Sequence, residues 1–139
     1  MSVPRASVRA WLQVRQPGPP ADLAAKLADS VGSAPESVFA GESLPAVLGA
    51  LGTWLLTAAV ERKQAACDAP DEGRPEVNTS DAPPAGTRLD AGAAAPDASA
   101  AAMELLAADA FVTYAFEAAS EEGSDVTGLA HQLLTMVRA

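Results

Sequence analysis

Histidine and cysteine each occur once in this chain, as His131 and Cys67, and isoleucine does not occur at all. A single cysteine excludes an intrachain disulfide. A single histidine without a second cysteine leaves no ligand set for zinc or haem, and the E-x-x-H spacing of di-iron carboxylate bundles is also missing. We find no nucleotide-binding loop and no catalytic motif. The sequence therefore predicts no metal site and no cofactor, and it disfavours an enzyme.

Cationic residues are also scarce. Nine Lys and Arg residues stand against 18 Asp and Glu residues, which gives a net charge of -9 and a pI near 4.4. An acidic surface repels phosphate backbones, so nucleic-acid binding is disfavoured. No apolar run of signal-peptide length follows the N-terminal arginines. We therefore expect a soluble cytoplasmic protein.

Large apolar residues are missing mainly from the middle of the chain. The segment 65–97 is rich in Pro, Gly, Ala and acidic residues and offers little to bury. This low-complexity composition is typical of a flexible, disordered tether. On both sides of it, Leu and Ala recur with helical spacing. We therefore divide one helical domain, 1–139, into a basic N-terminal segment at 1–19, a first helical half at 20–64, the tether, and a C-terminal helical hairpin at 98–139.

The first half contains two predicted helices. One spans residues 20–31 and carries Leu or Val at every fourth position, and the short turn after it should bury Phe39. The second begins near Ser43 and ends near Gln64, with most of its large apolar residues on one face. This apolar stripe comprises Leu44, Val47, Leu48, Leu51, Trp54, Leu55 and Ala58.

The second half contains two further predicted helices. Asp97 is the expected N-cap of a helix that ends near Ser120 and is apolar over more than half of its circumference, so it should be central. Few residues separate it from the last helix, and the two should form an antiparallel hairpin. The predicted buried stripe of the last helix comprises Val126, Leu129, Ala130, Leu133 and Val137.

These elements predict an all-α fold. We expect a small irregular bundle of three to four helices, with a long disordered loop between the helices at 43–64 and 97–120. Residues 2–16 fit two patterns, because apolar and polar residues alternate as in a strand while Val8, Trp11 and Leu12 also share one helical face. A lone strand cannot satisfy its backbone groups, so we favour a short helix.

The N-terminal segment is the best candidate for a binding element. Arg5, Arg9 and Arg15, with Trp11 among them, give it a charge opposite to that of the chain as a whole. Three alternatives follow from this charge. The segment pairs with acidic residues of the bundle, contacts a partner protein, or lies on an anionic membrane, although three cations give only modest membrane affinity.

Gly49 and Gly52 lie inside the predicted helix 43–64, where each costs about 1 kcal/mol relative to alanine. Close approach of another helix would offset this cost, either through packing within the chain or through self-association. The uncharged run from Ser43 to Val60 would reach roughly 27 Å, just short of the ~30 Å hydrocarbon core of a bilayer. Membrane insertion is therefore an alternative, but the apolar residues favour one face, as in a buried helix of a soluble protein.

We therefore expect a small soluble, non-catalytic interaction or accessory protein that acts with an unknown protein partner or as a homodimer. Two alternatives remain. One is a membrane-associated accessory protein that uses the helix at 43–60 or the basic N-terminus, and the other is an enzyme or ligand-binding helical bundle with an unrecognised site. The candidate interaction surface comprises Arg5, Arg9, Trp11, Arg15, Gly49 and Gly52.

Overall fold

The structure is a computed structural model that describes residues 2–68 and 96–139. These residues are helical throughout, apart from the connections between helices, and they contain no strand, so the all-α prediction is confirmed. The described ranges hold five α-helices and one 3-10 turn. In chain order these are α1 (Arg5–Gln13), α2 (Ala21–Ser33), η1 (Glu36–Ala40), α3 (Leu44–Asp68), α4 (Pro96–Glu122) and α5 (Val126–Arg138).

Three sequence predictions about the elements need correction. The expected bundle of three to four helices is too small, because the short N-terminal helix α1, which was expected, also packs into the core through Val8 and makes five helices in the described ranges. Helix α3 ends at Asp68 instead of Gln64. Ala65 and Ala66 are strong helix formers, and no proline interrupts the chain before position 70. Helix α4 begins at Pro96, so the predicted tether ends two residues too late and Asp97 lies inside the helix instead of capping it; proline is well tolerated in the first turn of a helix. The remaining residues of the predicted tether, 69–95, lie outside the described residues.

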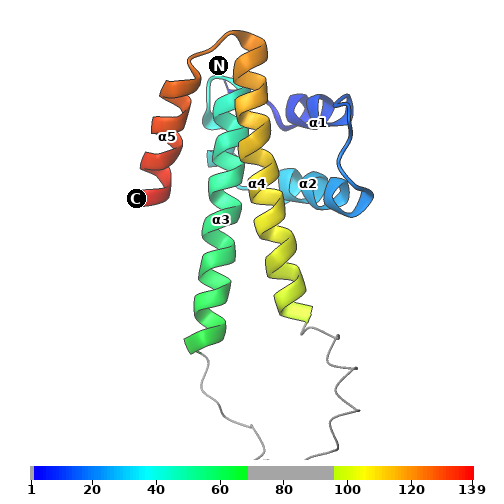
Figure 1. Cartoon of the computed structure of the whole chain (residues 1–139), viewed down its shortest axis with the longest axis vertical. Helices are drawn as coiled ribbons and strands as arrows, with labels where there is room; N and C mark the ends of the chain where they lie inside the picture. The colour runs from blue at the N-terminus through cyan, green and yellow to red at the C-terminus, as the bar shows by residue number, and fades with distance from the viewer. Residues whose placement is uncertain (1, 69–95) are drawn as a thin grey trace, which may run out of the picture.

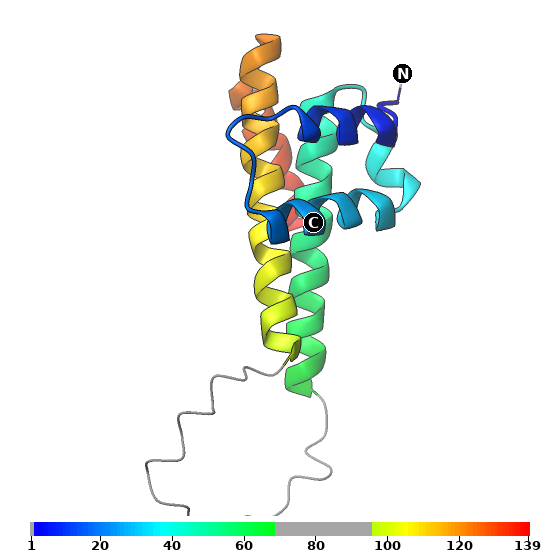
Figure 2. The ribbon, with the colours of Figure 1, turned by 90° about the vertical axis from the view of Figure 1, so that its right-hand side faces the viewer.

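Helices α3 and α4 run side by side and form the centre of the molecule (Figure 1). Helices α1 and α2 lie on one side of them and α5 on the other (Figure 1). A view turned by 90° shows that α1 and α2 lie roughly alongside one another and run across the long pair (Figure 2). Helices α4 and α5 form the predicted antiparallel hairpin through a turn at Gly123, whose positive φ of 67° suits glycine.

The core lies between α3, α4 and the α1–α2 pair. Phe39 of η1 is buried as predicted. The buried apolar residues of α3 are mainly Leu and Val, whereas those of α4 are mainly alanines. Small alanines let the two helix axes approach closely, which compensates for the scarcity of large apolar residues. The largest fully buried side chains are Phe111, Leu27, Leu48, Leu51, Val8, Val31 and Val47.

Burial on α4 and α5 differs from the sequence prediction. Leu105 and Leu106 of α4 are about half exposed, and so is Val137 of α5, which was expected to be buried. Val126 is also exposed, whereas Leu129 and Leu133 are buried as expected. For Leu105 and Val137 the reason is geometric, because both line the groove between α4 and α5 that no described helix covers.

Candidate interaction surface

Arg5 is bound within the chain, at the point where α2 ends. Its guanidinium donates hydrogen bonds to the backbone carbonyls of Val31 (2.7 Å), Gly32 (3.0 Å) and Ala34 (2.6 Å). It also pairs with Glu36 at 2.7 Å. The last carbonyls of a helix have no partner within the helix and carry partial negative charge, so a cation satisfies them well. Arg5 therefore joins α1 to the C-terminus of α2.

Arg15 joins the end of α1 to α4. Its guanidinium stacks 4.0 Å from the ring centroid of Trp11 and donates hydrogen bonds to the carboxylates of Glu117 (2.9 Å) and Glu121. The indole in turn meets Tyr114 edge-to-face, with the ring centroids 5.7 Å apart. Of the three placements considered for the basic N-terminus, this geometry is that of pairing with acidic residues of the bundle.

Tyr114 belongs to the same cluster. Burial against α1 raises the pKa of its phenol above the ordinary value of 10.0. The Glu117 carboxylate raises this pKa further, and the Arg15 guanidinium acts in the opposite direction. The phenol is therefore protonated at neutral pH and serves as a neutral packing partner.

Arg9 is more exposed than the other two arginines. Its guanidinium lies over Gly32 of α2, where an added Cβ would come within 3.0 Å of Nη2. It borders a depression of about 300 Å³ between α1, α2 and Tyr114. The binding role predicted for this residue stays a prediction.

Gly49 and Gly52 both face other helices of the same chain. A Cβ on Gly49 would lie 2.5 Å from a methyl group of Leu133 in α5. A Cβ on Gly52 would lie 2.7 Å from Val112 and 3.0 Å from the carbonyl oxygen of Ala108, both in α4. Of the two explanations offered for these glycines, close packing within the chain is the one that the geometry shows.

Glu104 is a buried carboxylate on the side of α4 that faces α2. Its side chain is only 3% exposed, and Oε1 lies 2.6 Å from Arg62 and 3.7 Å from Lys26. The other oxygen, Oε2, has no hydrogen-bond partner among the described residues. The carboxylate thus connects α2, α3 and α4. Burial of the unsatisfied Oε2 atom lowers the net stabilisation that these ion pairs provide.

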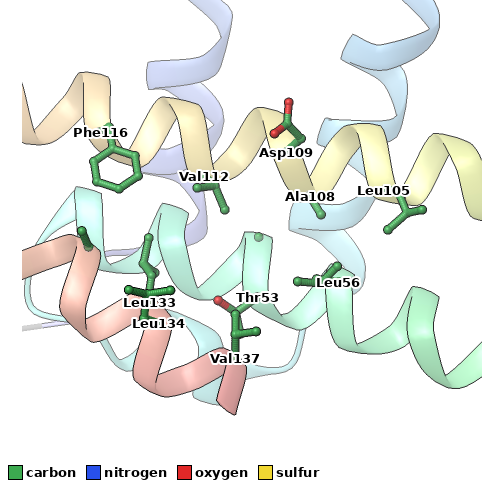
Figure 3. Close-up of a pocket in the computed structure, with 12 residues that line it drawn as sticks. Thr53, Leu56, Leu105, Ala108, Asp109, Val112, Phe116, Leu133, Leu134 and Val137 are labelled. Carbon is green, nitrogen blue, oxygen red and sulfur yellow. The ribbon is translucent and has the colours of Figure 1, made fainter. Parts of the chain in front are cut away.

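An apolar groove of about 460 Å³ lies between α3, α4 and α5 and was not predicted from the sequence (Figure 3). Leu105, Ala108 and Val112 project from α4 toward it, and Leu133, Leu134 and Val137 approach from α5 (Figure 3). Its lining comprises Gly52, Thr53, Leu56, Leu105, Ala108, Asp109, Val112, Phe116, Ala130, Leu133, Leu134 and Val137.

The groove carries little chemistry. Asp109 is the one charged residue of the lining, and its carboxylate points away from α3 (Figure 3). The Thr53 hydroxyl already donates a hydrogen bond to the Gly49 carbonyl, at 3.0 Å. No cluster of three or more His, Cys, Asp or Glu residues that could hold a metal ion occurs in the described ranges. The groove is therefore suited to contact with the apolar surface of another molecule, and not to catalysis or metal binding by its lining residues.

The rim of the groove is unusually apolar for a surface. Leu105, Leu134 and Val137 are 47%, 54% and 55% exposed. Leu106 and Val60, on the same two long helices, are exposed to a similar degree. Single exposed leucines are ordinary, but a gathered apolar patch on a protein surface usually marks a contact with another molecule. In the sequence, this patch could have been anticipated from the segment 97–120, whose apolar face is broader than one neighbouring helix can cover.

Two described helices, Leu44–Asp68 and the Ser99–Glu122 part of α4, are long and apolar enough to cross a membrane by length and composition. A core helix of a soluble protein passes the same test. Comparisons with protein-family models, with curated proteins and with solved structures gave no match.

Proposed function

We propose that this protein is a non-catalytic, cytoplasmic interaction protein whose contact surface is the groove between α3, α4 and α5. One observation carries the proposal, namely the exposed apolar lining of that groove. The basic N-terminus is a less suitable contact surface, because Arg5 and Arg15 already have partners within the chain.

The groove has the form that a helix fills. Its two walls are α4 and α5, and α3 forms its floor. Leu134 and Val137 stand at its edge with about half of their surface exposed, and the short side chain of Ala130 lies on the same helix between α5 and α3. Such grooves bind amphipathic helices through apolar residues spaced three and four apart. A bound helix would complete a four-helix bundle with α3, α4 and α5.

A quantitative capture experiment tests the proposal. Tagged full-length protein is compared with Leu134→Asp, which places a charge in the groove, and with Val14→Asp. Val14 is 74% exposed and lies outside the groove, so Val14→Asp is a matched control. We expect a stoichiometric protein that is retained by the wild type and by Val14→Asp and lost at least tenfold by Leu134→Asp. Equal retention by all three would remove the groove from the interaction.

A second candidate function is that of a membrane-associated accessory protein. The observation behind it is that the apolar window of α4 is only 28% buried in the fold, although it is long enough to span a bilayer. Fractionation separates the two proposals. The interaction protein should remain in the supernatant after membranes are pelleted, whereas a membrane protein should pellet and require detergent for its release.

A further inference from the structure

We infer that the depression between α1, α2 and Tyr114 binds a small organic carboxylate with an apolar body, and that Arg9 holds the carboxylate group. This depression lies on the side of the α3–α4 pair that α1 and α2 cover, away from the groove, so its ligand is independent of the proposed function. Three of its properties support a ligand of this class: the sign of its charge, its apolar walls and its volume.

The charge of the depression is opposite to that of the chain. The chain has 18 acidic residues and nine cationic ones, yet the lining contains two arginines and no Asp or Glu. Arg15 is already bound to Glu117 and Glu121, which balance its charge. The second arginine, Arg9, therefore determines the sign of the charge that this depression offers to a ligand.

Arg9 is the arginine that has no acidic partner. Its exposed guanidinium lies over Gly32 and borders the depression, and it makes no ion pair with a carboxylate of the described residues. A guanidinium donates two parallel hydrogen bonds to the two oxygens of a carboxylate. Arg9 can therefore bind one carboxylate without breaking a contact within the chain.

The walls of the depression are mainly apolar. Leu12 of α1 and Leu27 of α2 line it together with Ala24 and Ala28 of α2. A bare inorganic anion gains nothing from such walls, because it remains hydrated, whereas an aliphatic or aromatic body leaves water when it contacts them. The combination of apolar walls and one guanidinium therefore favours an organic carboxylate over a phosphate or sulfate ion.

The volume of about 300 Å³ is at the lower end of the roughly 300–1,000 Å³ of small-molecule sites, so the ligand should be compact. Tyr114 adds a neutral donor to the lining. Burial, together with the Glu117 carboxylate, raises the pKa of its phenol, which keeps its proton at neutral pH and does not compete as an anion. Because Tyr114 belongs to α4, the complete site exists only when α1 and α2 are docked on α4.

Titration of the full-length protein with phenylacetate and with hexanoate tests the inference, by calorimetry and by the shifts of backbone amide signals. The neutral amides of the two acids, phenylacetamide and hexanamide, are the matched control ligands. We expect at least one carboxylate to bind saturably and its amide to bind at least tenfold more weakly. Failure of both carboxylates to saturate at millimolar concentration would overturn the inference, and so would equal binding of acid and amide.

Three variants locate the site. Arg9→Gln should weaken carboxylate binding at least tenfold, whereas Arg138→Gln, which makes the same change of charge on α5, should bind as the wild type does. Ala28→Phe places a ring in the depression from an exposed position of α2 and should abolish binding, while circular dichroism shows unchanged helix content. Equal weakening by the two arginine variants would reveal a general effect of charge and overturn the inference, as would undiminished binding by Ala28→Phe.

Discussion

The two sides of the α3–α4 pair are covered by different means. On one side α1 and α2 bury apolar side chains such as Val8 and Leu27 in the core and are held in addition by charged groups. Arg5 binds the end of α2, Arg15 binds two glutamates of α4, and Glu104 pairs with two cations. On the other side α5 is held by apolar contacts such as Leu133 against Gly49. Each charged group holds its helix in one place, and because its hydrogen bonds are made within the chain, it has few left for another molecule. Apolar contacts that cover only part of a face leave surface available to another molecule.

Two phenylalanines of α4 measure how far the two sides differ in stability. Phe111 is fully buried and lies two helical turns after Glu104, on the side that α2 covers. Phe111→Ala should lower the free energy of unfolding by about 3–5 kcal/mol. Phe116 lines the groove and is only partly buried, so Phe116→Ala should cost about 1–2 kcal/mol. Chemical denaturation measures both, and equal losses would show that the groove side is packed as tightly as the other.

Arg5 tests the charged anchoring of α1. Arg5→Ala leaves three carbonyls at the end of α2 without their donor, and it should cost about 1–3 kcal/mol. Arg9→Ala is the matched control on the same helix, since Arg9 is exposed, and it should change stability by less than about 0.5 kcal/mol. Thermal or urea unfolding distinguishes them. If the two variants unfold alike, the Arg5 cluster does not hold α1 in place.

The two glycines of α3 compare its contacts with α4 and α5. Gly52→Ala pushes a methyl group against the Ala108 carbonyl, which cannot move without its helix, and should cost about 1–2 kcal/mol. Gly49→Ala meets only a terminal methyl of Leu133, which can rotate. The gain in helix propensity then offsets the crowding, and stability should change by less than about 1 kcal/mol. A larger loss at Gly49 would mean that α5 is fixed as rigidly as α4.

Glu104 should contribute little net stability despite its burial. Glu104→Met removes the unsatisfied oxygen, and the side chains of Arg62 and Lys26 retain access to water, so the change should stay below about 1 kcal/mol. Arg62→Met should be worse, because it leaves the buried carboxylate with only the more distant lysine. Urea unfolding of both variants provides the check. The reverse order would show that the carboxylate is a stabilising anchor.

The smallest effect concerns Tyr114 and appears only in alkali. Its pKa is raised in the folded chain, so the folded state retains the phenol proton to higher pH than the unfolded state does. The contribution of the Tyr114 phenol to the free energy of unfolding is therefore constant below pH 10.0, its pKa in the unfolded chain, and is lost as the pH rises through the folded pKa. Tyr114→Phe should remove this part of the decline. An unchanged alkaline profile would show that Tyr114 is as well solvated in the fold as in the unfolded chain.

The sequence was sufficient to predict the helices and the hairpin. The regular stripe from Leu44 to Leu55 identified α3, and the absence of a partner strand favoured a helix at residues 2–16. The first inference depends on residues close together in the chain, and the second on the lack of a second strand pattern anywhere in the sequence. The end of α3 was predicted four residues too early, at Gln64 instead of Asp68. Ala65 and Ala66 were assigned to the acidic, proline-rich segment that follows, although both favour a helix.

The contacts between distant segments were not predictable in the same way. Arg5 meets carbonyls 26 to 29 residues away, and Arg15 meets glutamates more than a hundred residues away. A Leu/Ala-rich helix also fits several packing orders equally well. The apolar pattern of α4 therefore predicted a central helix, but it did not show that Leu105 and Leu106 would remain uncovered.

The position of α4 late in the chain has a consequence for synthesis on the ribosome. Helix α3 ends at Asp68, and its main packing partner begins at Pro96, so α3 emerges before α4 exists. At about 5–20 residues per second, the nascent chain exposes Val47, Leu51 and Leu55 for more than about a second before Phe111 and its neighbouring alanines can cover them. We expect the first half of this protein to be bound by chaperones during translation and released only when α4 has emerged.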